Sequence, residues 1–194
     1  MGQGQQLFNE AMGHYQHAIE LVKTLYQVYW DAERTCSGRT GFGNKQQPLI
    51  YFDLILQAIL LSLAVSDKNF DPMEQQYVRK ITDYGDLTDY LRWWSHGKTN
   101  LTWEKIAEMS PATQQQLVAM LPDVLDQLCD DFVAPLAKVD SAIQETNFLS
   151  QLTEELYRIS SILGFMDGQV TAEEADASTD MIECLLSKRW KQMM

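Results

Sequence analysis

The chain has 194 residues, of which 45% are hydrophobic and 22% are charged. These are ordinary values for a globular protein, so they argue against a disordered chain and favour one compact domain over residues 1–194. Fifteen Lys and Arg against 27 Asp and Glu leave a formal net charge of −12. That charge repels phosphate backbones and anionic lipid headgroups, which disfavours nucleic acid as a partner.

The cysteines and the N-terminal residues predict the cellular compartment of the protein. Cys36, Cys129 and Cys184 are odd in number and stand in no metal-binding spacing, which fits free thiols in a reducing compartment. Residues 1–14 lack a basic segment followed by an apolar run. The longest apolar run, residues 58–65, is too short to span a bilayer. We therefore expect a cytoplasmic protein without direct membrane insertion.

Apolar residues at steps of three and four predict a succession of helices. The first covers Leu7 to about Arg34. After a loop that contains Gly and Pro, the second covers Leu49 to Ser66. The third runs from Pro72 to about Tyr84 and resumes after Gly85 through Trp94.

The middle of the chain predicts several short helices. Thr102 can cap one of them, and Ser110 followed by Pro111 is typical of the start of another. Pro122 and Pro135 divide this part of the chain further.

The last third of the chain predicts two helices. One pattern runs to Met166, and after a break at residues 167–171 the next runs from Ala172 to the C-terminus. No window shows the sustained alternation of a β-sheet. The sequence therefore predicts an all-α fold, a single-domain helical bundle.

Two segments repeat one pattern at an offset of 100 residues. Units of about 49–84 and 149–186 each hold an apolar helix, an Asp-led loop, an apolar residue, a helix cap and a Glu seven residues after the Asp. We expect two pseudo-repeated helix-loop-helix units whose apolar faces pack together. The paired positions that should be buried are Leu56 with Leu156, Ile59 with Ile159, and Leu63 with Leu163.

The repeat resembles a known family most clearly in the second unit, where residues 165–174 read FMDGQVTAEE. This pattern resembles the TerB-like family, a helical domain associated with tellurite resistance and with DnaJ-like cochaperones. The resemblance covers about 28 residues of each unit. It implies a shared acidic metal-binding surface and a role in a stress-response or membrane-associated assembly. The first unit departs from the pattern, because Lys68 replaces the usual Gly and Pro72 follows the cap.

The carboxylates of the two units are the candidate metal ligands. If the two loops face one another, their oxygens can bind a hard divalent cation, Ca²⁺ or Mg²⁺. Helix capping explains the same spacing, since a cap residue and a Glu at the third helical position form a capping box. Both interpretations stay open for one set of residues: Asp67, Asp71, Glu74, Asp167, Glu173 and Glu174.

Two histidines in the first predicted helix are a second candidate metal site. His14 and His17, with Glu10, lie at helical steps and can in principle bind a transition metal. Two helical histidines without a further converging ligand are weak evidence. A solvated polar face is the favoured interpretation.

The middle of the chain is unusually aromatic, with Tyr84, Tyr90, Trp93, Trp94 and Trp103. Such residues either fill a core or anchor a partner, and core filling is favoured here.

Catalysis has no support, because no nucleophile or metalloprotease motif such as GxSxG or HExxH occurs. We therefore expect a protein that is not an enzyme. One candidate function is the TerB-like cation-binding domain. The alternative is a module that binds another protein through its helical face or aromatic middle, with the acids serving only as helix caps.

Overall fold

The structure is a computed structural model, and it describes residues 3–36, 46–65, 70, 72–97, 100–128 and 148–165. These residues form helices joined by turns and loops, with no strand among them, which confirms the all-α prediction. Their bounds are α1 (Gln3–Cys36), α2 (Gln47–Ala64), α3 (Pro72–Lys80), α4 (Leu87–Trp94), α5 (Trp103–Glu108), α6 (Pro111–Val118), α7 (Leu121–Leu128) and α9 (Phe148–Gly164).

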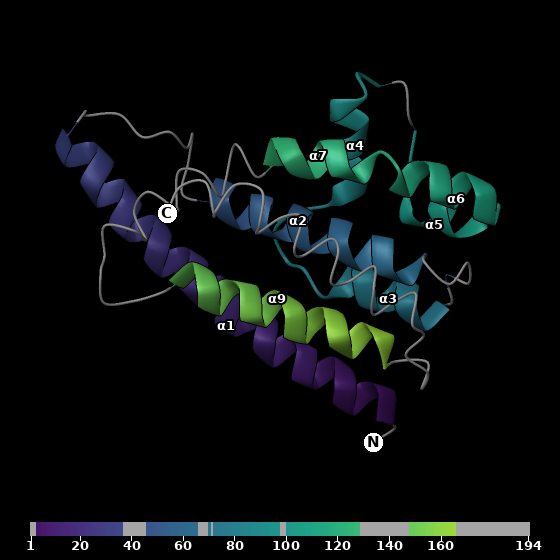
Figure 1. The fold of residues 1–194 in the computed structure, drawn as a ribbon, viewed down its shortest axis with the longest axis horizontal. Helices are drawn as coiled ribbons and strands as arrows, with labels where there is room; N and C mark the ends of the chain where they lie inside the picture. The colour runs from purple at the N-terminus through teal and green to yellow at the C-terminus, as the bar shows by residue number, and fades with distance from the viewer. Residues whose placement is uncertain are drawn as a thin grey trace.

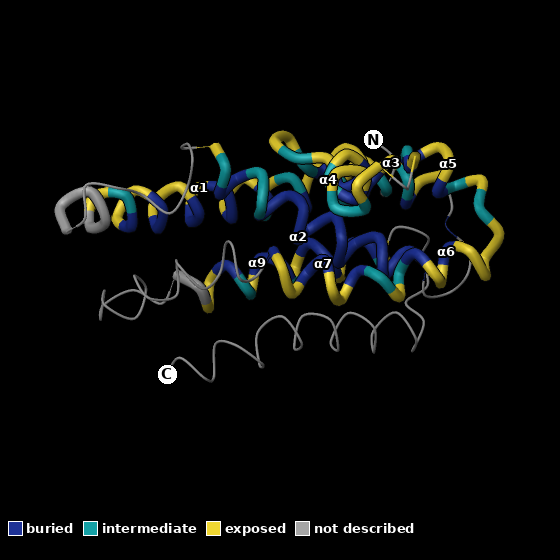
Figure 2. Tube along the Cα trace, turned by 90° about the horizontal axis from the view of Figure 1, so that it is seen from above, coloured by how far each residue is buried: buried dark blue, intermediate teal, exposed yellow. Residues whose placement is uncertain are grey.

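Helix α2 lies at the centre of the bundle (Figure 1). It packs against α1 and α9, and also against α3, α4 and α7. Its residues are apolar on nearly every side, and a helix of that kind needs neighbours all round it. The dark trace of α2 in Figure 2 shows the result, because almost the whole helix is buried.

By length and composition alone, α2 is long and apolar enough to cross a membrane. However, 83% of its 18-residue apolar window is buried inside the protein. The central helix of a protein core has the same length and apolar composition, so these two properties do not distinguish it from a membrane span.

Helices α1 and α9 lie side by side, although they come from opposite ends of the chain. Both present an apolar stripe, which in α1 includes Ala11, Ala18 and Val22. All six apolar positions paired by the sequence repeat are buried, which confirms that part of the prediction. The superposition of the two units stays a prediction, because residues 166–186 lie outside the described part of the chain.

Several helix starts agree with the capping residues predicted from the sequence. The hydroxyl of Thr102 accepts the Lys105 N–H at 3.3 Å, and that of Ser110 accepts the Thr113 N–H at 3.3 Å. One predicted helix end is wrong, since α3 ends at Lys80 rather than near Tyr84. Residues 81–86 instead form a loop whose backbone N–H groups bind a side chain of α2.

Candidate functional site

Only one of the six predicted cation ligands falls in the described part of the chain. Glu74 lies in the first turn of α3 and is 3% exposed. The other five ligands lie outside the described residues, as does the predicted cap at position 171: Asp67, Asp71, Asp167, Glu173 and Glu174. Among the described residues, no group of three or more His, Cys, Asp or Glu is arranged to hold a metal ion.

Asp53 is a buried carboxylate that the sequence analysis did not single out. Its Oδ2 accepts three consecutive backbone N–H groups, from Asp83 at 3.1 Å, Tyr84 at 2.5 Å and Gly85 at 3.0 Å. Its Oδ1 accepts the hydroxyl of Tyr15 at 2.9 Å, and that hydroxyl in turn accepts the Asp83 N–H at 3.0 Å. One side chain of α2 therefore joins α1 to the loop between α3 and α4.

Burial controls the proton affinity of this group. Loss of solvation raises the pKa of Asp53 to about 6, although its hydrogen bonds to Tyr84, Tyr15, Gly85 and Asp83 oppose the rise. Burial, and then the nearby Asp53 carboxylate, raise the pKa of Tyr15, so its hydroxyl stays protonated. Of these two groups, only the Asp53 carboxyl therefore changes its protonation state near neutral pH.

Gln57, one turn after Asp53, also binds the segment between α3 and α4. Its side-chain NH₂ donates to the Thr82 hydroxyl and, at 3.0 Å, to the Gly85 carbonyl. Its carbonyl oxygen accepts the Leu87 N–H at 2.7 Å. A sequence signal existed for both side chains, because a lone Asp and a Gln at i, i+4 in an apolar helix must find polar partners when buried.

The two histidines of α1 meet a carboxylate from α9. The Nδ1 of His14 lies 2.6 Å from Oε2 of Glu155, and the Nδ1 of His17 lies 3.0 Å from Oε1 of the same residue. Nη1 of Arg158 donates to Oε1 of Glu155 at 3.3 Å, and Nη2 donates to Glu154. The Glu155 side chain is 4% exposed, whereas those of His14 and His17 are 25% and 55% exposed.

This cluster corrects part of the interpretation of His14 and His17 as a solvated polar face: His17 is exposed, but one nitrogen of each ring contacts a buried carboxylate. Their polar edges face α9, because Glu155 lies on the buried stripe of that helix between Leu152 and Ile159. The sequence carried a signal here too, since an acid on an apolar helical stripe must be paired when it is buried.

The aromatic residues of the middle of the chain divide between core and surface. Trp103 is buried, as core filling predicts, but Trp93 is 71% exposed on α4. Its ring centroid lies 5.5 Å from that of the half-buried Tyr90. The core-filling interpretation is therefore wrong for Trp93.

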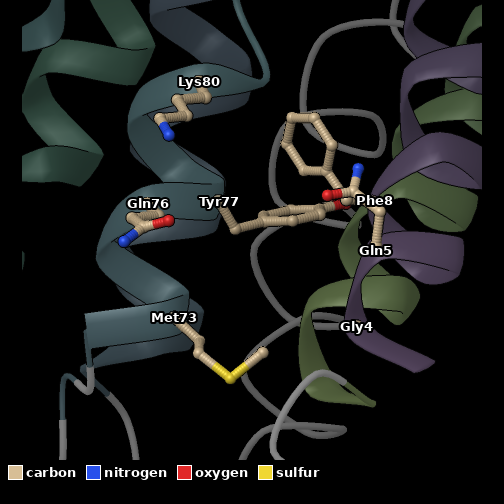
Figure 3. A pocket seen from close by; sticks show the side chains of 7 residues that line it. All are labelled: Gly4, Gln5, Phe8, Met73, Gln76, Tyr77 and Lys80. Atoms are coloured by element: carbon tan, nitrogen blue, oxygen red, sulfur yellow. The ribbon is translucent and has the colours of Figure 1, made fainter. Parts of the chain in front are cut away.

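A small surface hollow of about 200 Å³ lies between the N-terminal turns of α1 and one side of α3 (Figure 3). The rings of Phe8 and Tyr77 meet edge to face at its floor, with centroids 6.1 Å apart. The Tyr77 hydroxyl donates to the Ile159 carbonyl at 2.8 Å, so this ring also joins α3 to α9. Met73, Gln76 and Lys80 complete the lining from α3.

Comparison with known proteins identifies no relative: no family model, no curated protein and no solved structure matches the chain.

Proposed function

We propose that the protein is a non-enzymatic helical module that binds another protein through the exposed face of α4. The observation that carries this proposal is Trp93, the most exposed large hydrophobic side chain among the described residues. Leaving a Trp in water forfeits the burial of a large apolar side chain, and Trp is among the residues most enriched where protein interfaces gain their binding energy.

The neighbours of Trp93 define the chemistry of the partner. Asp89 and Tyr90 precede it by four and three residues, so they share its face of α4. Asp86 is the N-cap of the same helix, where its carboxylate accepts the Thr88 N–H and hydroxyl. Both aspartates are exposed. We call these four residues the α4 face. An aromatic ring flanked by carboxylates suits a segment that carries an apolar side chain beside Lys or Arg, since a cation can pair with the acids and stack on the indole.

Arg92 does not neutralise this face strongly. It forms an ion pair with Asp89 at 3.1 Å, with both side chains exposed. Exposed pairs of this kind contribute about 0–1 kcal/mol, so a partner cation can compete for the carboxylate.

Two of the buried carboxylates, Asp53 and Glu155, support a structural role rather than a catalytic one. Asp53 binds a loop to the core, and Glu155 joins α9 to α1. Neither carboxylate lines the surface hollow of Figure 3. The TerB-like cation site remains a separate prediction from the sequence.

Selection from a random peptide library on the immobilised protein, followed by affinity measurement, tests the proposal. We expect enriched peptides with Lys or Arg beside an apolar residue, and an affinity at least about 30-fold weaker for Trp93→Ala, as for an interface hot spot. Phe165→Ala is the matched control, because Phe165 is exposed at the end of α9. Peptides that bind the Trp93→Ala variant as well as the native chain would contradict the proposal.

A second pair of variants separates local from general electrostatics. Asp86→Asn with Asp89→Asn should weaken the selected peptides and reduce the salt dependence of binding, and Asn still caps α4. Asp123→Asn with Asp126→Asn changes the net charge equally on α7. Equal losses from both pairs would assign the binding to the net charge alone.

A further inference from the structure

The contacts of His14 and His17 with Glu155 favour one tautomer of each ring. Both rings present Nδ1 to one buried carboxylate, at 2.6 and 3.0 Å. An ionised carboxylate only accepts hydrogen bonds, and Nη1 of Arg158 lies 3.3 Å from Oε1 of Glu155. In a neutral imidazole Nδ1 therefore carries the hydrogen, and Nε2 carries the free lone pair.

The side chains of both histidines remain partly exposed to solvent. Nε2 lies across the ring from Nδ1, so each lone pair points away from Glu155. The side chains of His14 and His17 are 25% and 55% exposed. Residues at i and i+3 are neighbours on a helix surface. Two partly exposed rings thus occupy neighbouring positions of α1, each with Nδ1 facing Glu155.

This arrangement has the chemistry of an oriented metal-binding pair. Metal-binding histidines usually donate their second ring N–H to a carboxylate, which fixes the tautomer and raises the basicity of the ligand nitrogen. We infer that His14 and His17 bind a borderline divalent metal such as Zn²⁺ through Nε2, with Glu155 as the positioning carboxylate. Imidazole nitrogen suits Zn²⁺, Cu²⁺ and Ni²⁺, whereas Ca²⁺ and Mg²⁺ prefer oxygen.

The site is open rather than closed. The described residues offer no set of three or more ligands with metal-binding geometry, so the pair supplies two ligands and water fills the other positions. The net charge of −12 raises the local concentration of cations around the chain. This site is distinct from the acidic set predicted from the sequence, both in its residues and in the metals that it selects.

The first test measures the tautomers of the metal-free protein at neutral pH, by long-range ¹H–¹⁵N NMR of the imidazole rings. We expect His14 and His17 to carry hydrogen on Nδ1 and to leave Nε2 unprotonated. His96, the third histidine of the chain, lies exposed in the turn after α4 and serves as the reference signal. Hydrogen on Nε2 of either His14 or His17 in the neutral form would overturn the inference.

The second test titrates the full chain with ZnCl₂ while the same NMR signals and the heat of binding are followed. We expect one Zn²⁺ per chain and a selective shift of the His14 and His17 Nε2 signals. His14→Gln and His17→Gln should each weaken binding at least tenfold, and Glu155→Gln should weaken it about 10- to 100-fold. His96→Asn is the matched control and should leave the affinity unchanged.

The wild-type signals keep the inference testable if a variant fails to fold. Zn²⁺ binding that leaves His14 and His17 unshifted would overturn it, and so would Zn²⁺ binding that is lost in Asp167→Asn but kept in His17→Gln. The absence of any heat or shift with Zn²⁺ would overturn it as well.

Discussion

At the scale of single residues, Asp53 shows how a bundle of this kind uses a buried charge. Three backbone N–H groups and a Tyr hydroxyl satisfy its oxygens, but these bonds do not fully replace water. The carboxylate is therefore a source of pH dependence as well as an attachment point for the loop at residues 81–86.

We predict that Asp53 makes the folded state less stable as the pH rises between about 4 and about 6. Its pKa rises from 3.8 to about 6 on folding, so the folded chain binds the proton more tightly than the unfolded chain does. The stabilisation is fully present below about pH 4 and is lost as the pH passes about 6. The loss approaches about 3 kcal/mol, at about 1.4 kcal/mol for each pH unit of the shift.

Urea unfolding at a series of pH values, for the native chain and for Asp53→Asn, measures this effect. The difference between the two free energies of unfolding should change across that window, because Asn does not titrate. A constant difference from pH 4 to pH 7 would show that the pKa of Asp53 is not raised.

The acidic residues of the two repeat units lead to a second residue-scale prediction. If Asp67, Glu74, Asp167 and Glu174 converge on a cation, Ca²⁺ or Mg²⁺ should raise the melting temperature, because metal relieves their repulsion. Asp167→Asn should abolish that rise and leave the metal-free protein equally stable or more stable. A rise no larger than monovalent salt produces at equal ionic strength would leave only the capping role.

At the scale of the elements, the loop between α3 and α4 depends on a close approach to α2. A Cβ at Gly85 would lie 2.9 Å from the Ile50 carbonyl oxygen and 3.2 Å from Cβ of Asp53. Neither atom is the end of a flexible side chain, so the loop itself would have to move. The same movement would lengthen the hydrogen bond from the Gly85 N–H to Asp53.

We predict that Gly85→Ala destabilises the protein by about 1–3 kcal/mol, as overpacking of a core does. Gly13→Ala is the matched control, because a Cβ at Gly13 in α1 has no atom within 4 Å. That change should stabilise the protein by about 0.5–1 kcal/mol, since Ala favours a helix over Gly. Chemical denaturation measures both, and effects of the same sign would contradict the account of the loop.

At the scale of the whole molecule, α2 packs against more helices than any other helix of the described chain does. The α1–α9 pair lies against it, and so do α3, α4 and α7. A structure whose parts share one central helix should lose them together, because exposing α2 leaves each neighbour without its apolar partner.

We predict a single cooperative unfolding transition that a mutation of α2 shifts as a unit. Leu60 is fully buried, so Leu60→Ala should cost about 2–5 kcal/mol. Far-ultraviolet circular dichroism follows the helices. Trp fluorescence follows Trp30 of α1 and the tryptophans of α4 and α5, together with Trp190, which lies outside the described residues. Coincident transitions are expected, and two separate transitions would divide the chain into two domains.

The sequence by itself determined the features that depend on neighbouring residues. Helical periodicity predicted α1 and α2 to within a few residues, and it identified the buried positions Leu56, Ile59 and Leu63. Thr102 and Ser110 cap their helices as expected. These features follow from spacing along one helix, which a single sequence contains in full.

Only the tertiary structure decided which distant residues meet and which side chains stay in water. Glu155 binds His14 across 141 positions, and Asp53 binds backbone groups about 30 positions away. Trp93 is exposed although its large apolar side chain suits a core. A local pattern indicates that a buried acid needs a partner, but it does not say which residue the partner is. That depends on how whole helices pack and on which faces the packing leaves uncovered.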